Sequence, residues 1–187
     1  MARLVLAALR FYATGYYQRP VGEQWGISMS QSSISSSIRK VTNSINKIKF
    51  GQYVRFPMTA TERHEAIEQW TVSRHCFPGA IGAIDCTHDA IRGPYEHEES
   101  YVNHHGYHSI NIQMICDPTL KILNVNARYP GARHDSFIWS ASATRRVMRS
   151  YERGERGVYL IGGSGYPLEP WLMTPLPHEQ EGTARYR

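Results

Sequence analysis

Two aspartates fifty positions apart are the residues of this sequence whose types and surroundings point most clearly to chemistry. Asp85 closes an apolar run at residues 80–84, where a carboxylate is costly to bury unless a cation or hydrogen-bond donors meet it. Asp135 lies in a second stretch, residues 130–136. Carboxylate oxygens are the ligands that Mg²⁺ and Mn²⁺ prefer. We therefore predict that Asp85 and Asp135 are catalytic residues that together hold a divalent metal, Mg²⁺ or Mn²⁺.

Each acid also has a structural interpretation that the sequence leaves open. Asp135 can cap a following helix by accepting backbone N–H groups. Asp85 can bond to Thr87 or Arg92, which lie close to it along the chain. The arrangement of the two acids around a hairpin favours the metal site.

A dense group of histidines follows the first acid: His88, His97, His104, His105 and His108. Histidine side chains commonly bind zinc, but this group contains no HExxH pattern and has no cysteine pair beside it. We therefore expect a loop before a strand, where these side chains can approach phosphate or water. A solvated loop is the alternative.

The segments that must position these residues follow the order strand, hairpin, helix, strand. They are expected at residues 80–85, 107–116 with 121–127, 135 onward, and 157–161. In the first arm of the hairpin the apolar side chains face one way, and Asn111 and Gln113 face the other. Ribonuclease-H-like sheets begin in this order, with acids at the ends of the first and fourth strands. We expect such an α/β core, without the fifth strand that normally completes it.

Residues 1–50 are expected to form three helices that resemble a helix-turn-helix, with a tight turn at residues 26–28. The third helix begins near Ser30 and has an apolar face that includes Ile34 and Ile38. Its other face is predicted to contact DNA through Ser33, Ser36, Ser37, Lys40, Asn43 and Lys47. A small solvated helical bundle is the alternative.

Charge is distributed unevenly along the chain. The first 58 residues hold eight basic side chains and one acidic side chain, whereas the rest hold 13 basic and 15 acidic side chains. A basic head suits a polyanionic partner, and an acid-richer body suits cation binding. The three cysteines form no CxxC pair, which favours free thiols in a reducing compartment. No apolar run approaches the length of a membrane span, so we expect a soluble intracellular protein without a membrane partner.

Four motifs, taken together, resemble the PIF/Harbinger transposase superfamily, and in particular the Harbinger transposase-derived nucleases of animals. They lie at residues 82–88 (GAIDCTH), 100–109, 130–136 (PGARHDS) and 160–175. Residues 9–15, 21–28 and 33–41 are similar to the helix-turn-helix of the same family. The resemblance covers nearly the whole chain, and its motifs are specific as a set.

The resemblance implies a ribonuclease-H-like DDE nuclease domain at residues 79–187. A helix-turn-helix module at residues 1–50 and a linker with one helix at residues 51–78 would precede it. It also implies a divalent metal, DNA strand cleavage or joining, a nuclear location with the cytoplasm as the alternative, and a Myb-like partner protein. By position, Asp85 matches the first catalytic acid and Asp135 matches a further aspartate of the metal site.

Two acids of the family's site are missing from this sequence. The position that normally carries an aspartate after the fourth strand is Gly163, and the last acid falls beyond Arg187, so we interpret the domain as truncated. Glu169, Glu179 and Glu181 are available as substitutes, although their spacing does not indicate this role. We predict a nuclease with impaired catalysis, or alternatively a non-cutting fragment that binds DNA or a partner.

Overall fold

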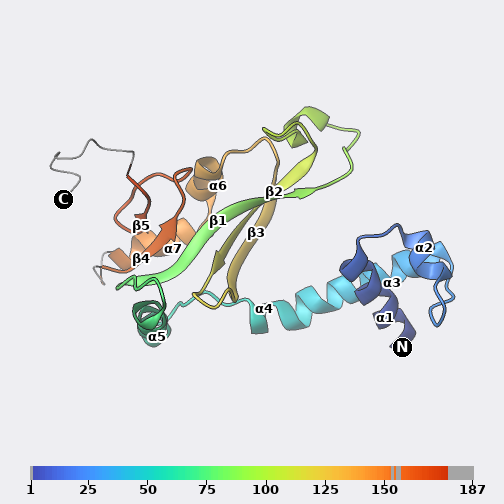
Figure 1. Ribbon diagram of the computed structural model, residues 1–187, viewed down its shortest axis with the longest axis horizontal. Helices are drawn as coiled ribbons and strands as arrows, with labels where there is room; N and C mark the ends of the chain where they lie inside the picture. The colour runs from blue at the N-terminus through green and yellow to red at the C-terminus, as the bar shows by residue number, and fades with distance from the viewer. Residues whose placement is uncertain (1, 153, 155–156, 177–187) are drawn as a thin grey trace. The chain divides into compact units, whose positions relative to one another are not determined.

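The computed structural model describes residues 2–152, 154 and 157–176. Two compact units are present, Met1–Tyr53 and Val54–Arg187 (Figure 1), and we call them the helical unit and the α/β unit. The functional boundaries predicted at residues 50 and 78 stay a prediction. No helix within the described ranges has the length and apolar character that spanning a bilayer requires.

The helical unit consists of short helices around a small core. They are α1 (Ala2–Thr14), α2 (Gln18–Glu23), α3 (Gln31–Ser44), a π-helical turn η1 (Ile45–Lys49) and α4 (Phe50–Tyr53). Gly15 follows α1 with a φ of 64°, and the Ser30 hydroxyl caps α3 by accepting the Ser33 N–H. Gly51, where we expected a linker to begin, lies inside α4. The core contains Ala7, Val21, Ile27 and Ile34.

The α/β unit is built on one mixed sheet of five strands in the order β3-β2-β1-β4-β5 (Figure 1). The strands are β1 (Ala80–Ala90), β2 (Ser109–Cys116), β3 (Ile122–Pro130), β4 (Tyr159–Gly162) and β5 (Leu172–Met173). β1 pairs antiparallel with β2 and parallel with β4, and β5 pairs parallel with β4. The predicted order of strand, hairpin, helix and strand is confirmed.

The expectation that the fifth strand is missing was wrong. Leu160 and Ile161 of β4 pair with Leu172 and Met173, and the Leu160 N–H donates to the Trp171 carbonyl at 2.9 Å. A strand of two residues is too short to show the alternation of apolar and polar positions that identifies a strand in a sequence. Pairing with an existing strand edge, rather than its own pattern, defines β5.

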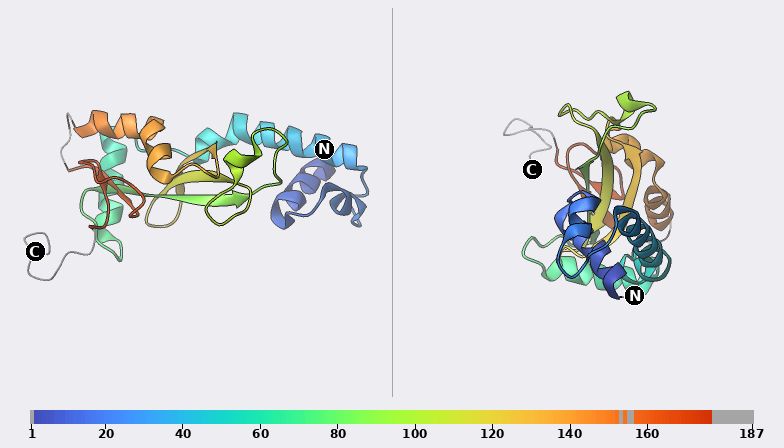
Figure 2. Two further views of the ribbon diagram at one scale, coloured as in Figure 1. Left: turned by 90° about the horizontal axis from the view of Figure 1, so that it is seen from above. Right: turned by 90° about the vertical axis from the view of Figure 1, so that its right-hand side faces the viewer.

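Helices α6 (Asp135–Ala141) and α7 (Ala143–Glu152) lie along one face of the sheet (Figure 2). The sequence pattern predicted one continuous helix here, but Ser142 adopts an extended ψ of 147° and divides it. A short η2 turn (Glu98–Tyr101) lies in the loop between β1 and β2. The buried core of the unit includes Ile81, Ile84, Ile115, Trp139, Met148, Leu160 and Leu172.

Helix α5 (Ala60–Val72) begins at a capping box. The Thr59 hydroxyl accepts the Glu62 N–H at 3.2 Å, and the Glu62 carboxylate accepts the Thr59 N–H at 3.0 Å. Reciprocal bonds of this kind satisfy two backbone donors that a helix start leaves unpaired. The cap therefore defines where the helix begins.

Candidate functional site

The parallel pairing of β1 with β4 brings Asp85 next to position 163. Ile84 is paired with Gly162, and the residues that follow this pair in the two strands are Asp85 and Gly163. Neighbouring strands lie about 4.8 Å apart, so a side chain at position 163 would stand beside the Asp85 carboxylate. A Cβ atom built on Gly163 meets no heavy atom of the described residues within 4 Å. The end of β4 therefore has room for a second acid, which glycine does not supply.

Asp85 itself is exposed to solvent and held by a local bond. Its Oδ1 atom accepts the backbone N–H of Cys86 at 2.9 Å, which differs from the bonds to Thr87 or Arg92 considered from the sequence. A carboxylate anchored through its own backbone needs no distant partner to keep its position. Asp85 is thus presented at the surface where β1 runs past the end of β4.

Asp135 is the first residue of α6 and lies half-buried against the sheet. Its Oδ1 atom accepts the Asn111 side-chain amide at 3.1 Å, and the same amide donates to the Arg133 carbonyl at 2.9 Å. The capping role considered for Asp135 belongs to His134, whose Nδ1 accepts the Ser136 N–H at 3.2 Å. Asp135 is therefore bound to β2 rather than to its own helix.

Cys86 lies between the two acids as a neutral thiol. Its Sγ atom is 3.1 Å from the Tyr166 hydroxyl. Burial raises the pKa of Cys86 to about 12; the Tyr166 hydrogen bond opposes this, and the charges of Asp135 and Asp85 add to it. Burial and the contact with Cys86 also raise the pKa of Tyr166 far above its usual value of 10. Neither group ionises near neutral pH, so Cys86 is not a thiolate nucleophile.

The two predicted metal ligands lie on different sides of β1. Successive side chains of a strand point to opposite faces, so Asp85 points away from the face that carries Cys86 and His88. Asp135 bonds to Asn111, which pairs with His88, and therefore lies on the Cys86 face. Within the described ranges, no three His, Cys, Asp or Glu side chains are grouped so that they could hold a metal ion. The described donors therefore do not fit a two-metal site. The catalytic and metal-binding roles of Asp85 and Asp135 stay a prediction.

A cavity of about 620 Å³ opens on the Asp135 side of the sheet. Asn111 and Gly131 line it, together with three of the predicted histidines, His88, His104 and His105. A Cβ atom on Gly131 would overlap the Ser109 side chain and the Tyr101 carbonyl oxygen, so only glycine fits there. The Gly131 N–H also donates to the Ser109 carbonyl at 2.8 Å, which fixes the loop between β3 and α6. We call this space the histidine cavity.

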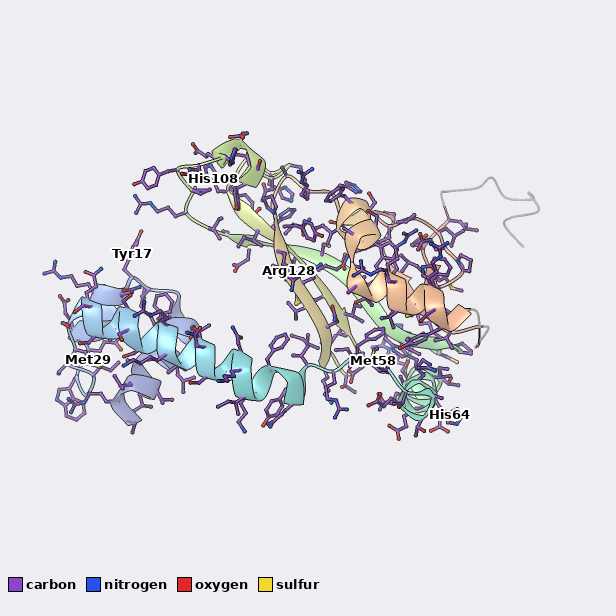
Figure 3. All side chains as sticks on the ribbon, turned by 180° about the vertical axis from the view of Figure 1, so that it is seen from behind. Tyr17, Met29, Met58, His64, His108 and Arg128 are labelled. Carbon is purple, nitrogen blue, oxygen red and sulfur yellow. The ribbon has the colours of Figure 1, made fainter. Side chains whose placement is uncertain are left out.

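The histidine rings of this cavity contact one another. The ring centroids of His104 and His105 are 3.8 Å apart, and those of His88 and His104 are 5.4 Å apart. Burial, followed by the neighbouring His104, lowers the pKa of His88, and Asp135 partly opposes the shift. His108, labelled in Figure 3, lies outside the cluster at the loop end of the sheet, and its Nε2 is 2.8 Å from Glu98 Oε1.

Glu169, considered as a substitute ligand, is already engaged. Its Oε1 atom accepts Arg145 Nη2 at 2.6 Å, and its Oε2 atom accepts Trp139 Nε1 at 3.0 Å. Glu179 and Glu181 lie outside the described residues. A carboxylate bonded in this way holds structural elements together and is not presented to a metal.

The six predicted DNA contacts lie on α3 and the turn that follows it. Lys40, Asn43 and Lys47 are exposed, and Ser33 and Ser36 are half-exposed. Ser37 is fully buried, and its hydroxyl donates to the Ser33 carbonyl at 2.6 Å. Ser37 therefore does not share the solvent-facing surface that we expected for it.

Sequence reasoning missed the polar residues beneath the site. Asn111 and Gln113 are 1% and 2% exposed, although polar residues on a strand usually indicate the solvent side. Tyr166, which contacts Cys86, was also not identified. The available signal was the Asn111–Gln113 alternation itself, which placed both residues on one face without showing that this face is covered.

Comparison with known proteins shows which family the sequence resembles. The sequence profile described as "DDE superfamily endonuclease" matches residues 84–186. The protein named "Putative nuclease HARBI1" from Homo sapiens is 35% identical over 98% of this chain and 50% of its own length. The protein of the same name from Xenopus laevis is 30% identical over 92% of this chain and 48% of its own length. "Protein ALP1-like" from Arabidopsis thaliana is 28% identical over 91% of this chain and 44% of its own length.

These relatives extend beyond the region compared, since the chain spans about half the length of the curated relatives it matches. No solved structure matches it. The profile match covers more than half of the 187 residues and includes Asp85, Asp135 and position 163. The chain therefore belongs to the DDE superfamily endonucleases, among the Harbinger transposase-derived proteins.

Proposed function

We propose that the α/β unit is a ribonuclease-H-like nuclease domain that acts on DNA phosphodiester bonds, and that its cleavage is impaired in this chain. The α2–α3 pair of the helical unit would serve as a helix-turn-helix that holds the DNA. The proposed cofactor is Mg²⁺ or Mn²⁺, and the proposed location is the nucleus. A nuclease-type function is supported by the family and by the names of the animal relatives.

The pairing of Ile84 with Gly162 is the observation that carries this proposal. With the strand order β3-β2-β1-β4-β5, it places Asp85, in the middle of β1, beside position 163, which directly follows the carboxyl end of β4. Ligands of open α/β sheets commonly bind beyond the carboxyl ends of the strands. Two acids in these positions would present oxygen ligands to a hard cation.

Impaired cleavage follows from what stands at position 163. Glycine has no side-chain ligand, and Asp135 interacts on the other face of β1. A two-metal mechanism needs carboxylates that clamp both the attacking and the leaving oxygen. The described donors of this chain are too few for such a clamp.

Replacing Gly163 with aspartate tests the proposal directly. The position is sterically open, and its backbone is outside the left-handed region that favours glycine. We expect Gly163→Asp to gain Mn²⁺-dependent nicking of supercoiled DNA, while Gly163→Asn, which has the same shape without the charge, does not. Asp85→Asn in the Gly163→Asp background should abolish the gain.

Nicking by Gly163→Asp that persists unchanged after Asp85→Asn would show that position 163 does not work with Asp85. A thermal shift on adding Mn²⁺ provides a second readout that does not depend on turnover. We expect a larger rise in melting temperature for Gly163→Asp than for Gly163→Asn. Equal shifts in both variants would contradict the proposed ligand pair.

DNA binding without cleavage is the second candidate, and the charge of the helical unit favours it. Seven side chains within residues 1–53 are basic and one is acidic, and Lys40 and Lys47 are exposed along α3 and η1. A non-cutting protein of this type would hold DNA or a partner, such as a Myb-like protein, through this unit. Salt-dependent DNA binding together with no nicking by any of the three variants would favour it.

A further inference from the structure

We propose that the histidine cavity binds an unpaired nucleobase of a nucleic-acid strand. The proposal rests on the proposed function, because it assumes that the strand lies across the α/β unit. It extends that function by naming the group that enters the cavity. The supporting observations are an unsatisfied buried acceptor, a set of neighbouring aromatic rings and the mixed charge of the walls.

The acceptor is the side-chain oxygen of Asn111. Asn111 is 1% exposed and lines the cavity, and its Oδ1 atom is buried without a hydrogen-bond partner among the described residues. The amide orientation is fixed, because Nδ2 donates to two acceptors, the Arg133 carbonyl and Asp135 Oδ1. A buried acceptor without a donor is destabilising, so a ligand that brings an N–H group is favoured.

Aromatic rings provide the stacking surface. His104 and His105 are exposed, with ring centroids 3.8 Å apart, and the planes of His105 and Tyr107 lie within 9° of each other. Unpaired bases stack on histidine and tyrosine rings in many nucleic-acid complexes, and every base has a π-face that can do so. Exposed rings beside a buried amide suit a nucleobase, whose flat face can stack on the rings while an N–H group at its edge donates to the amide oxygen.

The charge of the walls favours a base over a phosphate group. Arg133 and Asp135 both line the cavity, and the carboxylate would repel an anion placed between them. A neutral base with an exocyclic amino group can donate to Asn111 Oδ1 or to Asp135. The volume of about 620 Å³ lies in the range of small-ligand sites, about 300–1,000 Å³. The amino group of cytosine, adenine or guanine has two N–H bonds that can serve both acceptors, whereas thymine has only its ring N3–H, so these three bases should bind better than thymine.

Equal-length strands with and without bases test the inference on the full chain. Fluorescence anisotropy would compare a strand of deoxycytidines, a strand of abasic sites with the same charge, and a strand of thymidines. We expect the deoxycytidine strand to bind about five- to tenfold more tightly than the abasic strand, as expected for one stacked base. A strand of cytidines shows whether RNA is accepted as well.

Variants of exposed loop residues assign the difference to the cavity. His105→Ala should remove the preference for strands with bases, and His105→Phe, which keeps an aromatic face, should retain it. His97→Ala is the matched control, because His97 is 83% exposed in the same loop and does not line the cavity. Asn111→Ser should reduce the preference for cytosine over thymine, with circular dichroism used to confirm that the fold is kept.

The outcomes separate the two proposals. Equal binding of the deoxycytidine and abasic strands, or a preference that survives His105→Ala, would overturn the nucleobase site and leave the nuclease proposal intact. No binding to any strand, together with no nicking by Gly163→Asp, would overturn both. A base preference that is lost in His105→Ala and kept in His97→Ala supports the site.

Discussion

Arg145 bonds to Glu169 through two of its side-chain nitrogens and joins α7 to the segment before β5. Nε and Nη2 of Arg145 donate to Oε1 of Glu169 at 3.0 and 2.6 Å. Burial alone would raise the pKa of Glu169, but the hydrogen bonds from Arg145 and Trp139 outweigh it and lower the pKa. Glu169 is 12% exposed and Arg145 is 32% exposed, so the pair is only partly screened by solvent.

Arg145→Ala should lower the free energy of unfolding by roughly 2 kcal/mol, because it leaves the Glu169 carboxylate buried without its cation. The value is reduced from that of a fully buried pair because Arg145 is partly exposed. Chemical denaturation measures the loss. Arg146→Ala, at the exposed neighbouring position, should change stability by less than about 0.5 kcal/mol. Equal losses in both variants would show that the ion pair is not the cause.

Removing the helix cap at Thr59 should lower the free energy of unfolding by less than Arg145→Ala does. Thr59→Ala should destabilise the α/β unit by about 1 kcal/mol, because the Glu62 N–H loses its acceptor. Thr61→Ala removes a hydroxyl from the same turn without removing the cap and should have little effect. Urea denaturation of the two variants tests this difference, and a larger loss for Thr61→Ala would contradict the capping assignment.

Acid should destabilise the α/β unit partly through His88. Its pKa is lowered in the folded protein, first by burial and then by His104, so the unfolded chain binds the proton at a higher pH. The stability that His88 contributes is therefore complete above pH 6.5, the ordinary pKa of a histidine side chain, and is lost as the pH falls below it. His88→Gln should flatten the dependence of melting temperature on pH between about 7.5 and about 5.5.

His64→Gln is the control for this experiment. His64, labelled on α5 in Figure 3, is 75% exposed and lies in the same unit. This variant should keep the pH dependence of the parent protein. A profile that His88→Gln leaves unaltered would mean that other groups account for the acid sensitivity.

Salt dependence tests the DNA-binding role of the helical unit. If Lys40 and Lys47 each neutralise one phosphate, replacing both with alanine should reduce the slope of log affinity against log salt by roughly 1.8. Lys121→Ala, in the exposed turn between β2 and β3, should leave the slope unchanged. Titrations of a duplex at several salt concentrations measure both slopes. An unchanged slope in the double variant would remove α3 and η1 from the DNA contact.

Local sequence patterns predicted much of the fold because the elements concerned have strong periodicity or clear caps. The start of α3 near Ser30, its apolar face with Ile34, and the hairpin of β2 and β3 were all identified in this way. The division of the helix at Ser142 was missed, since serine is tolerated within helices and tertiary packing decides its conformation. The pairing of β5 was missed because it depends on an edge supplied by β4.

The candidate site was predictable in its residues but not in its geometry. Asp85 and Asp135 were identified from their local contexts, and the structure places them on different sides of β1. The side on which an acid projects depends on strand register, and one position reverses it. The sequence also did not reveal that Asn111 is buried. Its burial depends on bonds to the Arg133 carbonyl and Asp135, which belong to a distant segment of the chain.

Gly131 has a consequence for how copies of this sequence can diverge. No larger residue fits at position 131 against Ser109 and the Tyr101 carbonyl. The backbone is therefore held in place at a position four residues before Asp135. Between Gly131 and Asp135, His134 caps α6 and Arg133 lines the histidine cavity, whereas Ala132 is exposed and its side chain can be replaced more freely. A lineage in which this fold is still selected should therefore keep the glycine and the aspartate at their fixed spacing while position 132 varies.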